Sequence, residues 1–204
     1  MLLDLLAPPL CWSCRSPAGR GDPLCRACRR SLRFLPAAPT ALPGLETWAP
    51  VAYDGAARDL VKALKFRGAA GVAGAMAALI VANAPAGSLT GTLVPVPLHP
   101  ARRRTRPYNQ ATRLAEAISS RADLPLADCL HRIGPDSRQV GRGRSARLDG
   151  IAGSFGATAP VPAAALLVDD VVTTGATLAA CAAALRAAGT RQVGAIAFAR
   201  TAGR

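Results

Sequence analysis

The sequence contains no long apolar run. The longest, Gly68–Ala82, has 15 residues of mostly small side chains, fewer than the roughly 18 that a membrane-spanning helix needs. The first residues lack the basic segment of a signal peptide, and Asp4 interrupts their apolar stretch. The residues before Cys11 also lack the small side chains of a lipoprotein cleavage site. We therefore expect a cytoplasmic protein with no integral membrane segment.

Lysine, acidic residues and aromatic residues are scarce as well. Only Lys62 and Lys65 are lysines among 25 basic residues, and 12 acids leave a net charge of +13. A chain that is 50% hydrophobic and 18% charged can bury a core, which argues against intrinsic disorder. The charge indicates an anionic partner, such as nucleic acid, a phosphorylated small molecule or an acidic membrane surface. A GC-rich coding sequence would also produce abundant arginine and alanine.

The positive charge is concentrated in the middle of the chain. Residues 99–147 hold eleven arginines and four acids. Residues 36–98 and 148–204 each carry a net charge of +1, and residues 1–35 carry +4. The excess therefore marks particular segments and is not spread evenly along the sequence.

Four of the six cysteines form two CxxC pairs, Cys11 with Cys14 and Cys25 with Cys28, separated by ten residues. Each pair can present two sulfurs to one tetrahedral ion, so the spacing predicts a structural four-cysteine zinc site. Two disulfides would conflict with a cytoplasmic location, and a redox dithiol needs only one pair. A zinc–thiolate centre would offset part of the arginine charge in this segment; a ribbon that contacts nucleic acid is the alternative use of those arginines.

A proline-rich stretch separates this segment from the rest. Residues 36–47 begin with three prolines in nine residues and show no periodicity, which predicts an extended linker. We expect a zinc-binding, zinc-ribbon-like module at 1–35, the linker at 36–47 and a larger domain at 48–204. In the larger domain, predicted strands alternate with predicted helices, which favours an α/β domain with a mainly parallel sheet flanked by helices. The strands are predicted at 48–53, 92–97, 164–172 and 192–199, and the helices at 56–66, 71–84, 109–120 and 174–188.

The most informative segment is Ala165–Thr177. Four apolar residues lead to Asp169 and Asp170, and a Thr-Thr-Gly-Ala-Thr turn follows at 173–177. We expect the two carboxylates at the end of the strand, at the sheet edge where ligands bind in open α/β folds. The turn offers backbone N–H groups, hydroxyls and the positive end of a helix dipole, which together can hold a phosphate monoester. Two adjacent carboxylates in an apolar strand are costly unless they bind something.

This segment resembles the ribose-phosphate signature of the type I phosphoribosyltransferases, whose substrate is 5-phosphoribosyl-1-pyrophosphate (PRPP). The resemblance implies that Asp169 and Asp170 contact the ribose 2′ and 3′ hydroxyls and stabilise positive charge on the sugar during catalysis. It also implies that the turn holds the 5′-phosphate through Thr173, Thr174, Gly175, Ala176 and Thr177.

The rest of the chain resembles the competence protein F family, in which a phosphoribosyltransferase-like domain follows a four-cysteine module. Matching blocks are found at Tyr53–Gly55 with Leu64–Gly68, at Pro95–His99 with Arg102–Ala111, and at Gln139, Arg147 and Phe155. Pro107 and Tyr108 stand where the family usually has Gly-Phe, Gly150 where it usually has Asn, and Arg142 where it usually has an apolar residue. The resemblance implies a link to DNA uptake and to the proteins of the competence machinery.

Two arginine-rich segments have more than one interpretation. Arg102, Arg103, Arg104, Arg106 and Arg147 fit the binding of pyrophosphate with Mg²⁺, or of a single-stranded DNA backbone. A solvated run of charge is the plainest alternative. Ile133–Gly150 is our candidate for a lid that excludes water. Aromatic residues are sparse here, so a platform for base stacking is poorly supported.

Two functions follow from these observations. The first is a phosphoribosyltransferase that binds PRPP with Mg²⁺ and transfers the sugar to an unidentified acceptor. The second is a non-enzymatic protein of the same fold that binds single-stranded DNA. The sequence does not choose between them.

Overall fold

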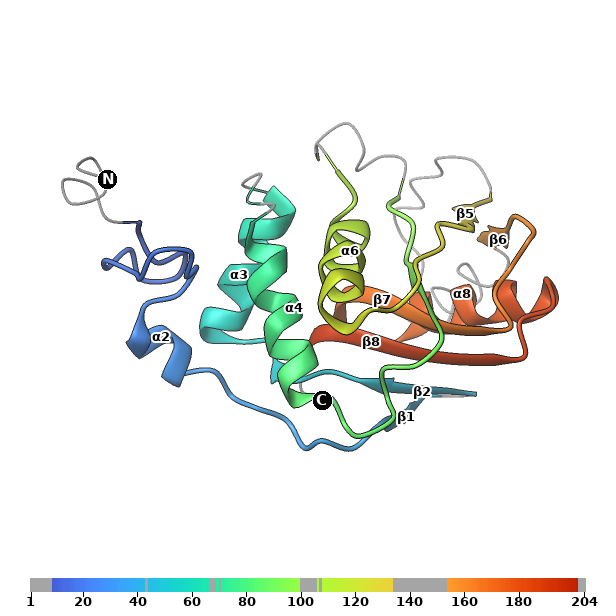
Figure 1. The fold of residues 1–204 in the computed structure, drawn as a ribbon, viewed down its shortest axis with the longest axis horizontal. Coiled ribbons are helices and arrows are strands. Elements are labelled where there is room, and N and C mark those ends of the chain that lie inside the picture. Colours follow the sequence, from blue (N-terminus) through green and yellow to red (C-terminus); the bar gives the residue numbers. More distant parts are fainter. Residues whose placement is uncertain are drawn as a thin grey trace, which may run out of the picture.

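The computed structural model describes residues 9–42, 44–66, 69, 71–99, 106, 108–133 and 154–201 (Figure 1). Helices and strands alternate through most of this chain. The helices are α2 (Arg26–Arg30), α3 (Gly55–Phe66), α4 (Val72–Asn83), α6 (Gln110–Ala122) and α8 (Ala176–Ala187). The strands are β1 (Thr40–Leu42), β2 (Leu45–Trp48), β3 (Val51–Ala52), β4 (Thr92–Pro95), β5 (Leu130–Arg132), β6 (Phe155–Ala157), β7 (Ala164–Val172) and β8 (Gln192–Arg200).

The central sheet is mainly parallel. Its strand order is β1-β2-β8-β7-β4, and β3 also pairs with β8. Among the described strands of this sheet, only β1 runs antiparallel to its neighbour. The two nine-residue strands, β7 and β8, lie side by side in the middle, because an apolar run buried on both faces is stable only at the centre of a sheet. The prediction of an α/β domain with a mainly parallel sheet is confirmed.

Helices cover both faces of the sheet. Successive residues of a strand point to opposite faces, and β7 follows this rule, since Leu166 and Val168 contribute to one core and Leu167 to the other. The first core is completed by α3, α4 and α6, and the second by α8. Because β4 and β7 are parallel neighbours, their carboxyl ends lie at the same edge of the sheet.

The predicted linker at 36–47 is wrong in part, because this segment adds β1 and β2 to the sheet. Thr47 pairs with Ala195 and Trp48 with Ile196, while Leu45 and Trp48 are buried. Prolines are tolerated beside short edge strands, so the proline-rich composition concealed two strands. The strand predicted at 48–53 is likewise interrupted after Trp48 and resumes as β3 beyond Pro50, which has no N–H to donate.

The cysteine-rich segment packs on the main core. Cys11, Leu24 and Leu32 belong to the same cluster of buried side chains as Leu60 of α3. The Ser13 hydroxyl donates a hydrogen bond to Asp59 Oδ2 at 2.7 Å. Within the described residues the N-terminal segment is therefore anchored to α3.

Two further observations complete the fold. Strands β5 and β6 form a separate antiparallel pair that the sequence did not predict. The candidate lid between them lies outside the described residues, apart from Ile133. None of the described helices is long and apolar enough to cross a membrane.

Candidate functional site

The turn after β7 leads directly into α8, as the sequence predicted. Strand β7 ends at Val172, and the helix begins at Ala176 after Gly175, whose φ is +76°. A Cβ at Gly175 would also collide with the Leu42 side chain of β1. Glycine is thus required here for its conformation and for its lack of a side chain. The first amides of α8 lie at the positive end of the helix, where an anion is stabilised.

Strand β7 has the predicted bounds, 164–172, and the two aspartates lie inside it, shortly before its carboxyl end. Asp169 pairs with Ala197 of β8, and the strand continues through Val172. The ladder continues past them because β8 is equally long and pairs along this whole stretch. Both aspartates line a pocket on this part of the sheet.

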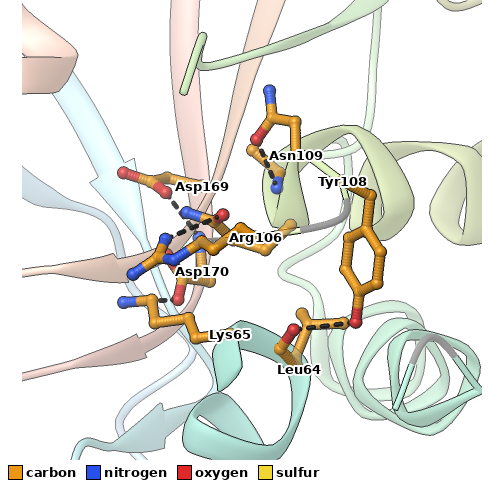
Figure 2. A network of polar contacts seen from close by, with 9 residues as sticks. Leu64, Lys65, Arg106, Tyr108, Asn109, Asp169 and Asp170 are labelled. Atoms are coloured by element: carbon orange, nitrogen blue, oxygen red, sulfur yellow. Dashed lines mark hydrogen bonds and ion pairs between the residues drawn. The ribbon is translucent and has the colours of Figure 1, made fainter. Parts of the chain in front are cut away.

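Asp170 is paired with a lysine from α3 (Figure 2). Its side chain is 3% exposed, and Lys65 Nζ lies 2.6 Å from its Oδ2. The Asp170 backbone N–H donates a hydrogen bond of 2.8 Å to Oδ1 of Asp169. Of the two neighbouring carboxylates, Asp170 therefore has the cationic partner.

Asp169 is in a different electrostatic position. Burial, and then the negative charge of Asp170, raise the pKa of Asp169 well above its ordinary value. Lys65 lowers the pKa by a smaller amount, because it lies beside the other carboxylate. A ligand that brings hydroxyl donors or a cation to Asp169 would relieve this cost.

A pocket of about 400 Å³ lies against these groups. It is formed where the segment after β4 meets β5, β7, α3, α6 and α8, and its lining is mostly polar. The lining residues are Tyr53, Lys65, Val96, Pro97, Leu98, His99, Gln110, Arg132, Asp169, Asp170, Val171, Thr173 and Thr177. A smaller recess of about 40 Å³ lies in the turn and is lined by Asp169 and residues 171–178. The structure thus brings the predicted carboxylates and the predicted turn to one site.

Arg106 closes one side of this network (Figure 2). Its guanidinium lies 4.9 Å from the centroid of the Phe66 ring and donates a hydrogen bond of 3.0 Å to Gln110 Oε1. The side chain is buried, with a relative exposure of 6%. Such burial leaves little surface for either of its predicted partners, pyrophosphate or a DNA backbone, and the role of Arg106 stays a prediction. The other predicted arginines, Arg102, Arg103, Arg104 and Arg147, lie outside the described residues.

The residues after Arg106 tie the surrounding elements together. The Tyr108 hydroxyl donates a hydrogen bond of 2.8 Å to the carbonyl oxygen of Leu64. Asn109 caps α6 by accepting from the Ala111 N–H at 3.1 Å, and its Nδ2 donates to the carbonyl oxygen of Val96 at 3.0 Å. These contacts hold the ends of α3, α6 and β4 around the pocket.

The four predicted zinc ligands meet at a second site. All four sulfur atoms lie within 4.8 Å of one another, and those of Cys14 and Cys25 are 3.6 Å apart. A tetrahedral zinc ion with Zn–S bonds of about 2.3 Å places its sulfurs about 3.8 Å apart. The set of four thiols fits zinc and leaves no coordination position for a substrate, so the cluster is suited to a structural ion.

Burial and the neighbouring thiols raise the pKa of Cys28 to about 12, while hydrogen bonds from Ser16 lower the pKa of Cys14 to about 6. One cluster thus contains thiols that differ widely in their readiness to ionise without a metal. A bound cation would favour the thiolate form of all four.

Two basic residues of the pocket were not proposed as site residues from the sequence. Lys65 and Arg132 come from α3 and β5, far from the Asp-Asp motif along the chain. Two signals were available for Lys65: it falls in the matching block at 64–68, and it is one of only two lysines among 25 basic residues. No local pattern marked Arg132, because β5 was itself not predicted.

Comparison with known proteins gives distant similarities only. No protein-family model matches the chain, and no curated protein matches it by sequence. Among solved structures, it is similar to glutamine PRPP amidotransferase from B. subtilis complexed with ADP and GMP, with 18% identity, a TM-score of 0.40, and coverage of 67% of this chain and 26% of that one. It is also similar to a structure described as the allosteric regulatory enzyme of purine biosynthesis, with 20% identity, a TM-score of 0.38, and coverage of 67% and 25%. The chain spans about a quarter of those proteins, and similarities of this size assign it neither a family nor an activity.

The cysteine cluster predicts that purified protein holds one zinc ion per chain. Cys14→Ser should abolish the zinc and lower the melting temperature by several degrees, because the cluster anchors core residues to α3. Cys14 is the appropriate site, since it is exposed and its replacement removes little packing. Elemental analysis and thermal unfolding measure both effects. Cys129→Ser, a buried thiol outside the cluster, is the control and should keep its zinc.

The raised pKa of Asp169 predicts a pH-dependent cost. When the pKa of a carboxyl group is higher in the folded than in the unfolded protein, its ionisation destabilises the folded state. The protein then loses stability as pH rises from the unfolded pKa through the folded one. Each unit of difference costs about 1.4 kcal/mol above that window. Asp169→Asn keeps the oxygen that accepts the Asp170 N–H but has no charge. Its stability relative to the wild type should therefore rise between about pH 4 and neutral pH.

Urea unfolding at a series of pH values measures this difference, and Asp170→Asn is the matched comparison. That variant leaves Lys65 without its counter-ion, so we expect it to be less stable than the wild type at neutral pH. Equal destabilisation by both substitutions at neutral pH would show that the Asp169 carboxylate is not under electrostatic strain.

Proposed function

We propose that this chain binds PRPP together with Mg²⁺ and is a phosphoribosyltransferase-like protein. The observation that carries the proposal is the convergence of the two β7 carboxylates and the turn at the N-terminus of α8 on one polar pocket. A sugar phosphate has the complementary chemistry, because its hydroxyls donate to carboxylates and its phosphate accepts from backbone amides.

Each part of the substrate is assigned to a different part of the site. The 5′-phosphate is assigned to the turn of residues 173–177, whose threonine hydroxyls add donors to the amides. The ribose hydroxyls are assigned to Asp169 and Asp170. The pyrophosphate is assigned to the pocket wall that includes Lys65 and Arg132, because both contribute cationic groups to its lining. Arg102, Arg103, Arg104 and Arg147 are proposed as further pyrophosphate contacts.

Mg²⁺ enters this scheme as part of the substrate. It prefers oxygen ligands and commonly reaches proteins on phosphate oxygens, with one or two carboxylates nearby. Asp169 fits that arrangement, since it lines the pocket while the adjacent Asp170 is the partner of Lys65. A cation bound beside Asp169 would counter the burial and the Asp170 charge that raise its pKa, because a cation stabilises the ionised form.

The reaction would be a substitution at C1 of the ribose. The bond from C1 to the pyrophosphate oxygen breaks with its electron pair on the leaving group, and a bond from the acceptor to C1 forms. A proton on the acceptor, where there is one, passes to water. Positive charge that develops on the sugar is stabilised by the carboxylates of β7, and removing water from the pocket protects the donor from hydrolysis.

We further propose membership of the competence protein F family, with a role linked to DNA uptake and to the competence machinery. The sequence blocks at 53–55, 64–68, 95–99 and 102–111 support it. The structure lends support because the described parts of these blocks converge: Lys65, His99 and Gln110 line one pocket. The four-cysteine cluster before the sheet agrees with the same family, with zinc in a structural role.

Single-stranded DNA binding is the second candidate function. The observation that favours it is the exposed basic surface of the N-terminal segment, where all six arginines are solvent-exposed. They are Arg15, Arg20, Arg26, Arg29, Arg30 and Arg33. Two of them, Arg29 and Arg33, are paired with Asp22 and Asp54, so a DNA backbone would compete with those acids.

PRPP with Mg²⁺ should raise the melting temperature of the wild-type protein. A ligand at one hundred times its dissociation constant adds about 2.7 kcal/mol of stability to the folded state. Asp169→Asn and Asp170→Asn should each reduce or abolish the shift, because each removes a charged acceptor for ribose hydroxyls. Thermal unfolding with and without PRPP measures this. Arg191→Gln, at the end of β8 that lies away from the pocket, is the control and should keep the shift. The absence of a shift in the wild type would exclude a PRPP site.

Single-stranded DNA affinity, if present, should fall with salt by a log–log slope of about −0.7 per phosphate contacted. Arg26→Gln with Arg30→Gln should flatten that slope if the N-terminal arginines bind the backbone. The triple change of Arg102, Arg103 and Arg104 to Gln should flatten it if the central segment does. Fluorescence anisotropy across a salt series separates these cases. A slope that neither variant changes would rule out both surfaces as the DNA site.

A further inference from the structure

A second cavity lies next to the sugar-phosphate pocket, at the carboxyl edge of the sheet. Its volume is about 320 Å³, and it is lined by the last residues of three strands: Ala52 of β3, Val172 of β7 and Arg200 of β8. Thr173, the first residue of the turn, lines this cavity and the 400 Å³ pocket alike. A molecule in this cavity would therefore lie beside a sugar phosphate held by the turn.

Much of the wall is apolar. Leu35, Leu42, Ala52 and Val172 contribute hydrocarbon surface to it. The volume is at the lower end of the range of small-molecule sites, which are typically apolar with a few placed polar groups. Such a cavity suits one planar ring better than a free phosphate, because a phosphate would lose hydration against the apolar wall.

One charged group on this wall has no counter-ion among the described residues. Arg33 lies 2.7 Å from Asp54 and is thereby neutralised. The Arg200 side chain, in contrast, has no hydrogen-bond or ion-pair partner within the described part of the chain. Its backbone is held firmly, since its carbonyl oxygen accepts from the Tyr53 N–H at 2.8 Å. Arg200 thus brings to the lining of a largely apolar cavity a positive charge without a counter-ion among the described residues.

Threonines supply the remaining polar groups. Thr40, Thr47, Thr173 and Thr201 all line the cavity. Thr47 is 2% exposed, and its hydroxyl has no hydrogen-bond partner among the described residues. A buried hydroxyl without a partner is costly, and a polar edge on a bound ring would lie close to it.

We propose that this cavity is the acceptor pocket and that it takes a small planar ring compound that carries a carboxylate. The ring lies against the apolar wall, and Arg200 binds the carboxylate through a charge-assisted hydrogen bond. This proposal rests on the proposed function for its consequence: a ring nitrogen gives its electron pair to C1 while the C1–O bond to pyrophosphate breaks. The proton of that nitrogen, where it carries one, passes to water, and pyrophosphate leaves with the bond electrons.

Two pairs of probes test the proposal, since the members of each pair differ chiefly in the carboxylate. They are nicotinate with nicotinamide, and orotate with uracil. Calorimetric titration into the full chain, with and without PRPP and Mg²⁺, should show at least one carboxylate binding about tenfold or more tightly than its neutral counterpart. Arg200→Gln should remove that difference. Arg200→Lys should retain part of it, because the charge remains while the bidentate geometry is lost.

Arg191→Gln is the matched control, because it removes the same charge at the other end of β8, away from this cavity. It should leave the difference intact. Thermal unfolding checks that every variant is folded. The proposal is overturned if neither carboxylate binds at millimolar concentration, if neutral and anionic members bind equally, or if Arg200→Gln has no more effect than Arg191→Gln.

The PRPP-induced thermal shift is measured on the same samples, and it keeps the two hypotheses apart. A PRPP shift without any carboxylate binding would overturn the acceptor pocket and leave the proposed function standing. Arg200-dependent carboxylate binding without a PRPP shift would support the pocket and overturn the proposed function. Arg200→Gln should keep the PRPP shift, because its side chain does not line the sugar-phosphate pocket.

Discussion

The ion pair between Lys65 and Asp170 is the interaction on which the arrangement of the site depends. A central strand buried on both faces does not tolerate two adjacent carboxylates unless one of them is neutralised. Asp170 is almost fully buried and obtains its counter-ion from the end of α3. That requirement fixes where α3 must end relative to β7. The Tyr108 hydrogen bond to the carbonyl oxygen of Leu64 then ties the approach to α6 to the same point.

The site therefore combines a satisfied carboxylate with a strained one. Asp169 remains in a position that favours its protonated form, although it lies on the same strand as its paired neighbour. An electrostatically unfavourable group lowers the stability of the folded protein, and a bound ligand can offset that loss. A destabilised carboxylate that faces a polar pocket is therefore more typical of a binding site than of a structural core. The apolar cavity on the other side of Thr173 contains the opposite case, Arg200, whose side chain has no acidic partner among the described residues.

Local sequence patterns were sufficient for the features that depend on short stretches of chain. The alternation of strands and helices, the turn into α8 and the two CxxC pairs were all predicted correctly as local features. Each depends on periodicity or on spacing within a few residues, which the sequence displays directly. The prediction failed where the local composition suggested one structure and pairing with a distant strand produced another. Residues 36–47 have the composition of a spacer, yet Leu45 and Trp48 are buried because β2 pairs with β8.

The sequence by itself determined the chemistry available to this protein: an Asp-Asp pair in an apolar strand, a threonine- and glycine-rich turn before a helix, and four closely spaced thiols. Only the tertiary structure decided which partners each group has. Lys65 of α3, Arg132 of β5 and Arg200 of β8 are separated along the chain by many tens of residues, and the packing of these elements brings each of them to a cavity lined by residues of β7. Burial then distinguishes the two aspartates, because desolvation and ion pairing depend on neighbours that no local pattern identifies.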